Sequence, residues 1–270
     1  MTASVNDFPT HEARFRLDGR TVFLSGAAGH LGRAMALAFG QAGAHVILNG
    51  RTEAKLQGLA GEMAEAGLSA SVFACDVMDR ERANGFLSSL ARLDVLVNNA
   101  ITGLAANASS GSDAFRTMIE SGLIAANENV SAALPALEAA AAAVGHASVI
   151  NVTSIWGHVS PKPKLYGDSG RLSPPQYGAT KGGLLQLTRY LSVIHAPKRI
   201  RVNSLSPGIF PWDEIVEKDP EFTAAMAEQS PMNRLGLAHE IAGPAVFLAS
   251  DAASYMTGAD LKIDGGWTAW

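Results

Sequence analysis

The chain has 270 residues, of which 47% are hydrophobic and only 17% are charged, so it can bury a large core and is not a disordered segment. Its 21 Lys and Arg are outnumbered by 25 Asp and Glu, and a net charge of -4 without a basic block argues against a nucleic-acid partner. The single cysteine, Cys75, excludes an internal disulfide and favours a reducing, cytoplasmic location.

The N-terminal segment lacks the basic start and apolar core of a secretory signal. We therefore expect an extension over 1–16 and one domain over 17–270. The most apolar long stretch, 130–150, is mostly alanine and contains Pro135, Glu138 and His146. A membrane span needs about 20 strongly apolar residues, so we expect a buried or subunit-facing helix there and no membrane partner.

Short β-branched runs alternate with longer stretches of helical period along the whole chain. Strands are predicted at 21–25, 45–48, 72–74, 95–98, 149–153, 201–206 and 261–263, and helices at 31–41, 53–66, 79–90, 113–143, 177–195, 221–228 and 238–249. This alternation is typical of an α/β fold with a doubly wound parallel sheet, a Rossmann fold, whose helices cover both faces. Two Pro-rich segments, at 160–176 and 209–220, follow the fifth and sixth strands and are expected to wall a substrate pocket.

A glycine-rich turn follows the first predicted strand and precedes a helix, with glycines at Gly26, Gly29 and Gly32. Such glycines permit a tight turn and let a pyrophosphate approach the helix N-terminus, where the dipole is positive. His30 and Leu31 belong to the same candidate cofactor site. His30 has no partner cluster that would make it a metal ligand, so no metal site is predicted.

The second predicted strand ends in Asn49, Gly50 and Arg51, without the carboxylate that would bind a ribose 2′-hydroxyl. An arginine attracts a 2′-phosphate through charge and a planar set of donors, which favours NADP(H) over NAD(H), although a solvated arginine is the alternative. Asp76 and Val77, after the third strand, are candidates for contacting the adenine. An aspartate at that place also suits a helix cap.

Further motifs follow in a fixed order: Asn98-Asn99-Ala100, Ser154, Tyr177-Gly-Ala-Thr-Lys181, Asn203-Ser-Leu-Ser-Pro207-Gly208 and Asp264-Gly265-Gly266. With the glycine turn and Asp76, this order resembles that of the short-chain dehydrogenase/reductase family over about residues 17–266. Within that family, the Asn49-Gly50-Arg51 segment and the Gly265-Gly266-Trp267 tail are similar to gluconate 5-dehydrogenases. The resemblance adds to the cofactor site Asn99, Ala100, Pro207, Gly208 and Ile209, and it implies a homodimer or homotetramer.

The resemblance also assigns catalysis to Ser154, Tyr177 and Lys181. Tyr177 and Lys181 are four residues apart on a predicted helix and therefore share one face. A phenol has a pKa of about 10, too high for efficient proton transfer at neutral pH, and the neighbouring ammonium is expected to lower it. Tyr177 would then exchange a proton with the reacting oxygen while Ser154 hydrogen-bonds that oxygen. Lys181 would also hold the nicotinamide ribose.

Tyr166 is a rival for the catalytic role, since it lies nearer to Ser154 in sequence than Tyr177 does. Gly170, however, occupies the position where its lysine would be, so Tyr177 keeps the role and the segment 160–176 carries an insertion. We expect this insertion to form a lid, with Trp156, His158 and Tyr166 near the substrate. A subunit contact or an ordered surface loop is the alternative.

Several positions depart from the family pattern. Ile101 replaces a glycine after the fourth strand, and Trp212 stands where a threonine often contacts the nicotinamide amide, so Trp212 is a candidate substrate contact. Gly122 occupies the helix position of a fourth catalytic residue, an asparagine that supports a water relay to the lysine. Asn129 lies about 10 Å farther along the helix and does not replace that amide directly.

The leading hypothesis is an NADP(H)-dependent enzyme that interconverts a secondary alcohol and a ketone on a small polar, hydroxylated or carboxylated substrate. A 3-oxoacyl thioester reductase is the enzymatic alternative, for which Lys162, Lys164 and Arg171 would offer a basic surface to an acidic carrier. An alternative from a different class is a catalytically weak NADP-binding sensor or scaffold, motivated by Gly122 and Ile101.

Overall fold

The centre of the molecule is a parallel sheet of seven strands, seen in a computed structural model that describes residues 10–103, 111–166 and 172–270. The strand order is β3-β2-β1-β4-β5-β6-β7, and each neighbouring pair is parallel. The strands are β1 (Thr21–Ser25), β2 (His45–Gly50), β3 (Ala70–Ala74), β4 (Val95–Asn98), β5 (Ala147–Val152), β6 (Ile200–Pro207) and β7 (Asp260–Ile263). The order reverses between β1 and β4, which confirms the predicted doubly wound fold and places a ligand crevice at the carboxyl ends of these strands.

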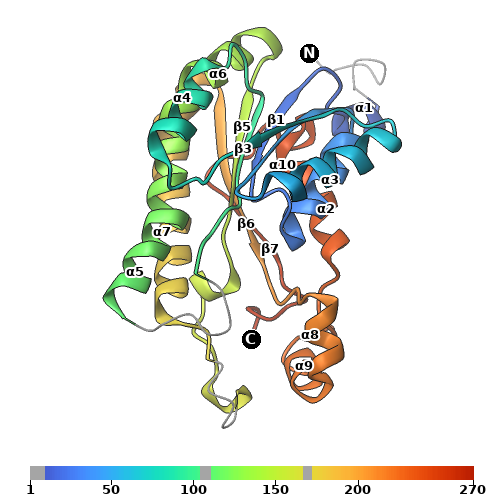
Figure 1. Cartoon of the computed structure of the whole chain (residues 1–270), viewed down its shortest axis with the longest axis vertical. Coiled ribbons are helices and arrows are strands. Elements are labelled where there is room, and N and C mark those ends of the chain that lie inside the picture. Colours follow the sequence, from blue (N-terminus) through green and yellow to red (C-terminus); the bar gives the residue numbers. More distant parts are fainter. Residues whose placement is uncertain (1–9, 104–110, 167–171) are drawn as a thin grey trace, which may run out of the picture.

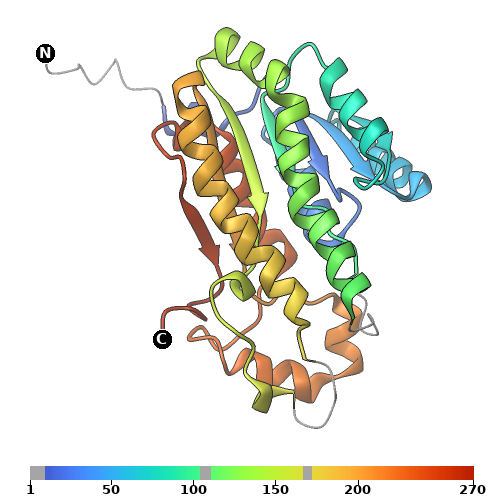
Figure 2. The same cartoon turned by 90° about the vertical axis from the view of Figure 1, so that its left-hand side faces the viewer.

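Helices cover both faces of the sheet (Figure 1). One face carries α4 (Arg80–Ser89), α6 (Ala125–Val144) and α7 (Pro175–His195), and Figure 2 shows α6 and α7 side by side across it. The other face carries α1 (His11–Phe15), α2 (His30–Gln41), α3 (Glu53–Glu65) and α10 (Ala242–Ala249). The remaining helices are α5 (Ser112–Ile119), α8 (Asp213–Lys218) and α9 (Pro220–Ala227), and they lie toward the carboxyl end of the sheet.

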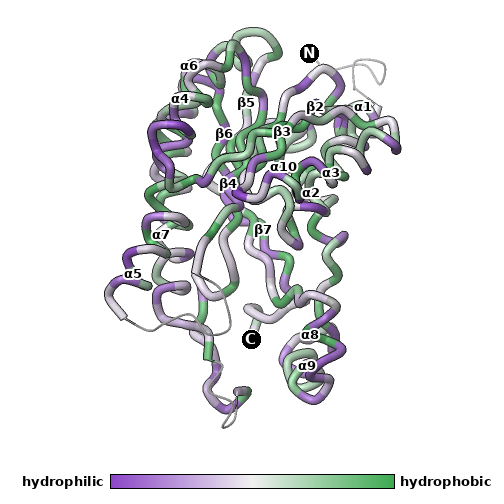
Figure 3. The backbone as a smooth tube through the Cα atoms, viewed as in Figure 1, coloured by the Kyte–Doolittle hydropathy of each residue, from purple (hydrophilic) through white to green (hydrophobic). Residues whose placement is uncertain are grey.

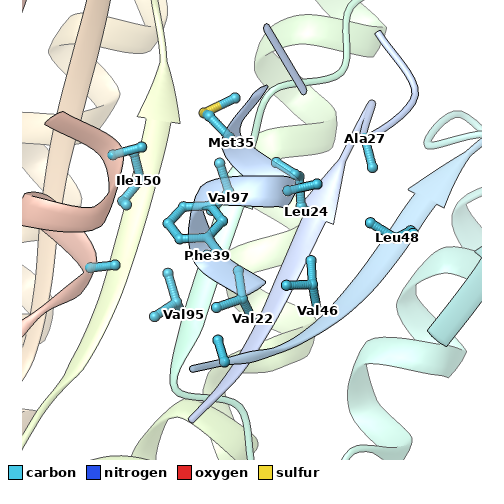
Figure 4. Close-up of a cluster of buried hydrophobic side chains, with 14 of the residues drawn as sticks. Val22, Leu24, Ala27, Met35, Phe39, Val46, Leu48, Val95, Val97 and Ile150 are labelled. Carbon is cyan, nitrogen blue, oxygen red and sulfur yellow. The ribbon is translucent and has the colours of Figure 1, made fainter. Parts of the chain in front are cut away.

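The core is divided into two layers by the sheet, because successive strand residues point to opposite faces. In β1, Val22 and Leu24 pack with Phe39 of α2 (Figure 4), whereas Phe23 belongs to the other layer, beneath α4 and α6. Since both faces are covered, β1, β2 and β4 are largely apolar runs, whereas β6 and β7 mix apolar and polar residues. In Figure 3 much of the central sheet is hydrophobic, and much of α4 and α8 is hydrophilic. Among the described residues, none of the helices is both long and apolar enough to cross a bilayer.

The structure differs from the sequence prediction mainly around 113–143, which was expected to form one helix. Three segments occupy it: α5, a π-helical segment (Glu120–Ile124) and α6. The π-helical segment contains Gly122, which packs directly against α7. Two short helices, α1 and α8, were not expected, because short polar helices carry little apolar periodicity.

A third apolar cluster lies outside both sheet layers, at the carboxyl end. It contains Ile155, Tyr166, Met226 and Trp267, with Trp156 and other apolar residues packed against it. The cluster therefore joins the segment after β5, helix α9 and the C-terminal turn into one unit beside the ligand crevice.

Candidate active site

A cavity of about 530 Å³ opens at the carboxyl ends of the strands, where loops after β1 to β6 meet the start of α7. It brings together most of the residues that the sequence nominated: Gly26, Gly29, His30, Leu31, Gly32, Asn49, Arg51, Asp76, Val77, Asn99, Ala100, Ser154, Tyr177, Lys181, Pro207, Gly208 and Trp212. Ile209 instead lines a smaller neighbouring cavity of about 240 Å³.

The turn between β1 and α2 has the shape of a phosphate cradle. Gly26 has a φ of 67°, in the region that side chains rarely adopt, and a Cβ on Gly32 would overlap the backbone oxygen of Gly26. Asn99 fixes the turn from β4 by donating its amide to the carbonyl oxygens of Ser25 (3.0 Å) and Gly26 (3.2 Å). The N-terminus of α2 has no side-chain cap, so its backbone N–H groups are available to an anion.

The far end of the cavity combines a buried amide with exposed cations. Asn49 donates to the carbonyl oxygens of Phe73 (3.0 Å) and Cys75 (3.1 Å), so its amide anchors the end of β3. Arg51 and Lys55 line the cavity, are exposed, and form no ion pair with another residue in the described ranges. Lys55 was not predicted as a site residue from the sequence. Its spacing of four residues from Arg51 is the pattern that could have indicated it.

The structure does not place Asp76 at a helix cap, which was the alternative role that the sequence allowed. Asp79, not Asp76, caps α4 by accepting from Arg82 N at 3.3 Å. Asp76 accepts from Met78 N at 2.9 Å and lines the cavity beside Val77. Burial raises the pKa of the neighbouring Cys75 thiol, which is 3% exposed, so this cysteine is a poor nucleophile.

Ser154, Tyr177 and Lys181 lie together at the nicotinamide end expected for this fold. Tyr177 and Lys181 occupy the first turns of α7, with the Lys181 Nζ 5.8 Å from the Tyr177 ring centre. The Tyr177 and Ser154 side chains are hydrogen-bonded to each other. Lys181 is 3% exposed and donates to the carbonyl oxygen of Val152 at 2.6 Å.

The protonation of these groups differs from the sequence expectation. Burial raises the pKa of the Tyr177 phenol, and the hydrogen bond from Ser154 offsets only part of that rise. Burial also lowers the pKa of Lys181 from 10.5 to about 8. The expected lowering of the phenol pKa by the ammonium is therefore absent here, because Lys181 faces Val152 and desolvation dominates. Tyr177 is consequently a protonated phenol at neutral pH, which is the acid form.

Gly122, where the family resemblance implies an asparagine, has no room for a side chain. A Cβ on Gly122 would lie 2.6 Å from Thr180 Cγ2 and 3.1 Å from Ile101 Cδ1. Asn129 is engaged elsewhere, donating to Asn98 Oδ1 at 3.0 Å. Apolar groups thus fill the space beside α7.

Of the four nominated substrate contacts, Tyr166 belongs to the third apolar cluster and Trp156 packs against it, while His158 contacts Asp260 and Ser206. Tyr166 is 7% exposed, with its ring 5.8 Å from that of Phe222, and Trp156 stands edge-on to Trp267 at 5.8 Å. Trp212 does line the cavity, and its ring lies 4.6 Å from that of His30. These two rings come from the loop after β6 and the start of α2, so they meet over the crevice.

The predicted lid insertion at 160–176 is only partly within the described residues. Its first part packs toward α9, where Lys162 donates to Gln229 at 3.1 Å. Gly170 and Arg171, which entered the arguments on the rival tyrosine and on a basic surface, lie outside the described residues.

Comparison with known proteins places this geometry in a family. Residues 26–268 match the family model described as enoyl-(acyl carrier protein) reductase. Galactitol 2-dehydrogenase (L-tagatose-forming) of Cereibacter sphaeroides is 34% identical over 95% of this chain and 98% of its own length. A 3-oxoacyl-(acyl-carrier-protein) reductase of Rickettsia conorii is 31% identical over 93% and 97%. The crystal structure of a gluconate 5-dehydrogenase from Burkholderia cenocepacia, in complex with NADP and tartrate, is 28% identical, with a TM-score of 0.82 over 96% of this chain and 99% of that one.

Proposed function

Because the chain belongs to the short-chain dehydrogenase/reductase family, we propose that it is an NADP(H)-preferring oxidoreductase of small polar secondary alcohols and ketones. Its place in the family makes it an oxidoreductase that interconverts a secondary alcohol and a ketone. Tyr177, hydrogen-bonded to Ser154 at the end of the cavity, is the observation that carries the proposal.

The cavity fits a dinucleotide by its donor set. The turn at Gly26 and Gly32 is shaped for close approach of a phosphate, and the uncapped N-terminus of α2 supplies N–H donors. Arg51 and Lys55 place two solvated cations at the end of β2, where a 2′-phosphate would be bound. The relative crystallised with NADP supports the same preference.

A nicotinamide bound in this cavity would supply a hydride or accept one. Tyr177 donates its proton to a carbonyl oxygen during reduction and takes it back during oxidation. Ser154 hydrogen-bonds the same oxygen and stabilises its developing charge. Lys181 has a pKa of about 8 and faces the Val152 carbonyl, so it holds the β5 end against α7 and is poised to bind a ribose hydroxyl.

The substrate class is a small hydroxylated or carboxylated carbonyl compound. The relatives act on galactitol or gluconate by name, and one was crystallised with tartrate. Trp212 and Thr102 line the mouth of the cavity and would contact such a compound. No structural observation specifically favours the 3-oxoacyl thioester alternative.

A homodimer or homotetramer in the cytoplasm is part of the same proposal. Tyr190, Val193 and Ile194 are exposed on one face of α7, an apolar strip that a second copy would cover. Cys75 is unpaired and buried, as expected of a protein in a reducing compartment. Light scattering coupled to size-exclusion chromatography measures the assembly directly.

The test is NADPH oxidation followed against a panel of keto acids, keto sugars and 3-oxoacyl thioesters, with wild type and Tyr177→Phe. We expect turnover of a keto acid or keto sugar, reduced about 10²–10⁴-fold in the variant, whereas NADPH binding measured by fluorescence changes much less. Full turnover by Tyr177→Phe would contradict the role of the phenol. Preference for the thioesters would favour the enzymatic alternative, and tight NADPH binding without turnover would favour the sensor.

A further inference from the structure

Buried polar side chains form a network beneath the turn that carries Ser154, and the chemistry above does not use them. Asp260, the first residue of β7, accepts through one carboxylate oxygen from the hydroxyls of Ser204 (2.6 Å) and Ser206 (2.7 Å). Its other oxygen lies 3.0 Å from Nε2 of His158. The two serines are fully buried, and the His158 and Asp260 side chains are only 17% and 11% exposed.

The network reaches Ser154 from both directions along the chain. Thr153, the preceding residue, has its hydroxyl oxygen 2.6 Å from that of Ser206. The Thr153 hydroxyl also lies 3.0 Å from the carbonyl oxygen of Leu205, so either hydroxyl can be the donor in the hydrogen bond between Thr153 and Ser206. His158, four residues after Ser154, ends on the same carboxylate. The residues that flank the catalytic serine are therefore both linked to one carboxylate on β7, that of Asp260.

The other side of this turn is held by α7. A 3₁₀ turn (Ile155–Gly157) follows Ser154, whose hydroxyl accepts from Trp156 N at 3.2 Å. A Cβ on Gly157 would lie 2.9 Å from the carbonyl carbon of Lys181 and 3.0 Å from the nitrogen of Gly182. The turn is thus confined between the helix that carries Tyr177 and the polar network on β6 and β7.

We propose that His158 and Asp260 are positioning residues that hold the Ser154 hydroxyl in register with Tyr177. Burying a carboxylate costs free energy unless the group is paired. The presence of Asp260 beside the turn that carries Ser154 therefore indicates that its directional hydrogen bonds have a function. The proposal rests on the proposed function for its effect on turnover. Its effect on the Ser154–Tyr177 hydrogen bond is independent of any substrate.

The variants separate a lost hydrogen bond from lost stability. His158→Leu removes the Nε2 that lies 3.2 Å from the hydroxyl of Ser206 and 3.0 Å from the carboxylate of Asp260, whereas His158→Gln retains an N–H near that position. His146→Leu is the matched control: His146 immediately precedes β5, is 15% exposed, and its Nε2 lies 2.7 Å from Asp251 at the opposite end of the sheet. Both leucine variants remove a histidine of similar burial that faces an aspartate, although Asp251 is 54% exposed and Asp260 only 11%, and only the His158 pair borders the site.

The first readout is turnover in wild-type and Ser154→Ala backgrounds. We expect His158→Leu to lower kcat about tenfold with intact Ser154, and to cause no further loss once Ser154 is replaced. His158→Gln should recover most of the rate, and His146→Leu should leave kcat unchanged. An equal loss of kcat in the wild-type and Ser154→Ala backgrounds would overturn the proposal. So would a kcat of His158→Gln that is no higher than that of His158→Leu at equal thermal stability.

The second readout is the ultraviolet titration of Tyr177, obtained by subtracting the Tyr177→Phe spectrum in each background. Because the hydrogen bond from Ser154 lowers the pKa of Tyr177, His158→Leu should raise that pKa and His146→Leu should not. An unchanged titration in His158→Leu would refute the positioning role. If wild type turns over no carbonyl compound, the proposed function fails while this titration still decides the inference.

Discussion

Replacing Lys181 with methionine should stabilise the fold at neutral pH while abolishing turnover. Burial lowers the pKa of Lys181 from 10.5 to about 8, and this fall corresponds to about 3 kcal/mol of unfavourable free energy for the charged lysine in the folded state. The substitution also leaves the Val152 carbonyl oxygen without its 2.6 Å donor, which costs about 1–2 kcal/mol. The net expectation is a gain of about 1–2 kcal/mol at pH 7.

The pH dependence gives the sharper test, and its sign follows from proton counting. Between pH 8 and 10.5 the unfolded chain keeps the Lys181 proton and the folded chain has lost it, so wild-type stability rises with pH in this window. The gain from Lys181→Met should therefore shrink and reverse toward pH 10. Urea unfolding of both proteins across this range measures the difference, with Lys198→Met, an exposed lysine, as the control. A difference that does not depend on pH would refute the reasoning.

Four further substitutions probe the cofactor end. Arg51→Ala and Lys55→Ala should each raise the KM for NADPH about tenfold and leave that for NADH nearly unchanged, as steady-state kinetics with both cofactors will measure. Gly32→Ala should abolish NADPH binding in calorimetry, because its Cβ would overlap the backbone of the preceding turn. Trp212→Ala removes the ring that lies 4.6 Å from His30 over the crevice, so NADPH should dissociate several-fold faster in stopped-flow fluorescence, and an unchanged rate would argue against this contact as a barrier.

The sheet was predictable from sequence because its central strands are buried on both faces and the strands form short β-branched segments between helical stretches. The glycine turn was predictable for a different reason: Gly26 and Gly32 are required by backbone geometry, which leaves a direct trace in the sequence. Parallel strands bring their carboxyl ends to one edge of the sheet. The predicted strands and the glycine turn therefore indicate where most residues of the candidate site lie.

The features that sequence missed depend on contacts between distant segments. The π-helical segment around Gly122 packs against Thr180, and no local pattern announces it. Trp156 and Tyr166 were expected near the substrate, and that role stays a prediction; their rings contact those of Trp267 and Phe222, which sequence spacing does not reveal. The raised pKa of Tyr177 likewise depends on burial, which spacing along a helix does not reveal.

The apolar cluster of Ile155, Tyr166, Met226 and Trp267 is separate from the two layers that stabilise the sheet. Substitutions of its residues are therefore expected to leave the sheet and the glycine turn of the dinucleotide site intact. The cluster also packs beside the segment after β5 and the C-terminal turn, so substitutions in it are expected to alter the shape of the substrate mouth. Because Ile155 directly follows Ser154 in a turn that positions this serine, a library for altering substrate preference is best confined to Tyr166, Met226 and Trp267.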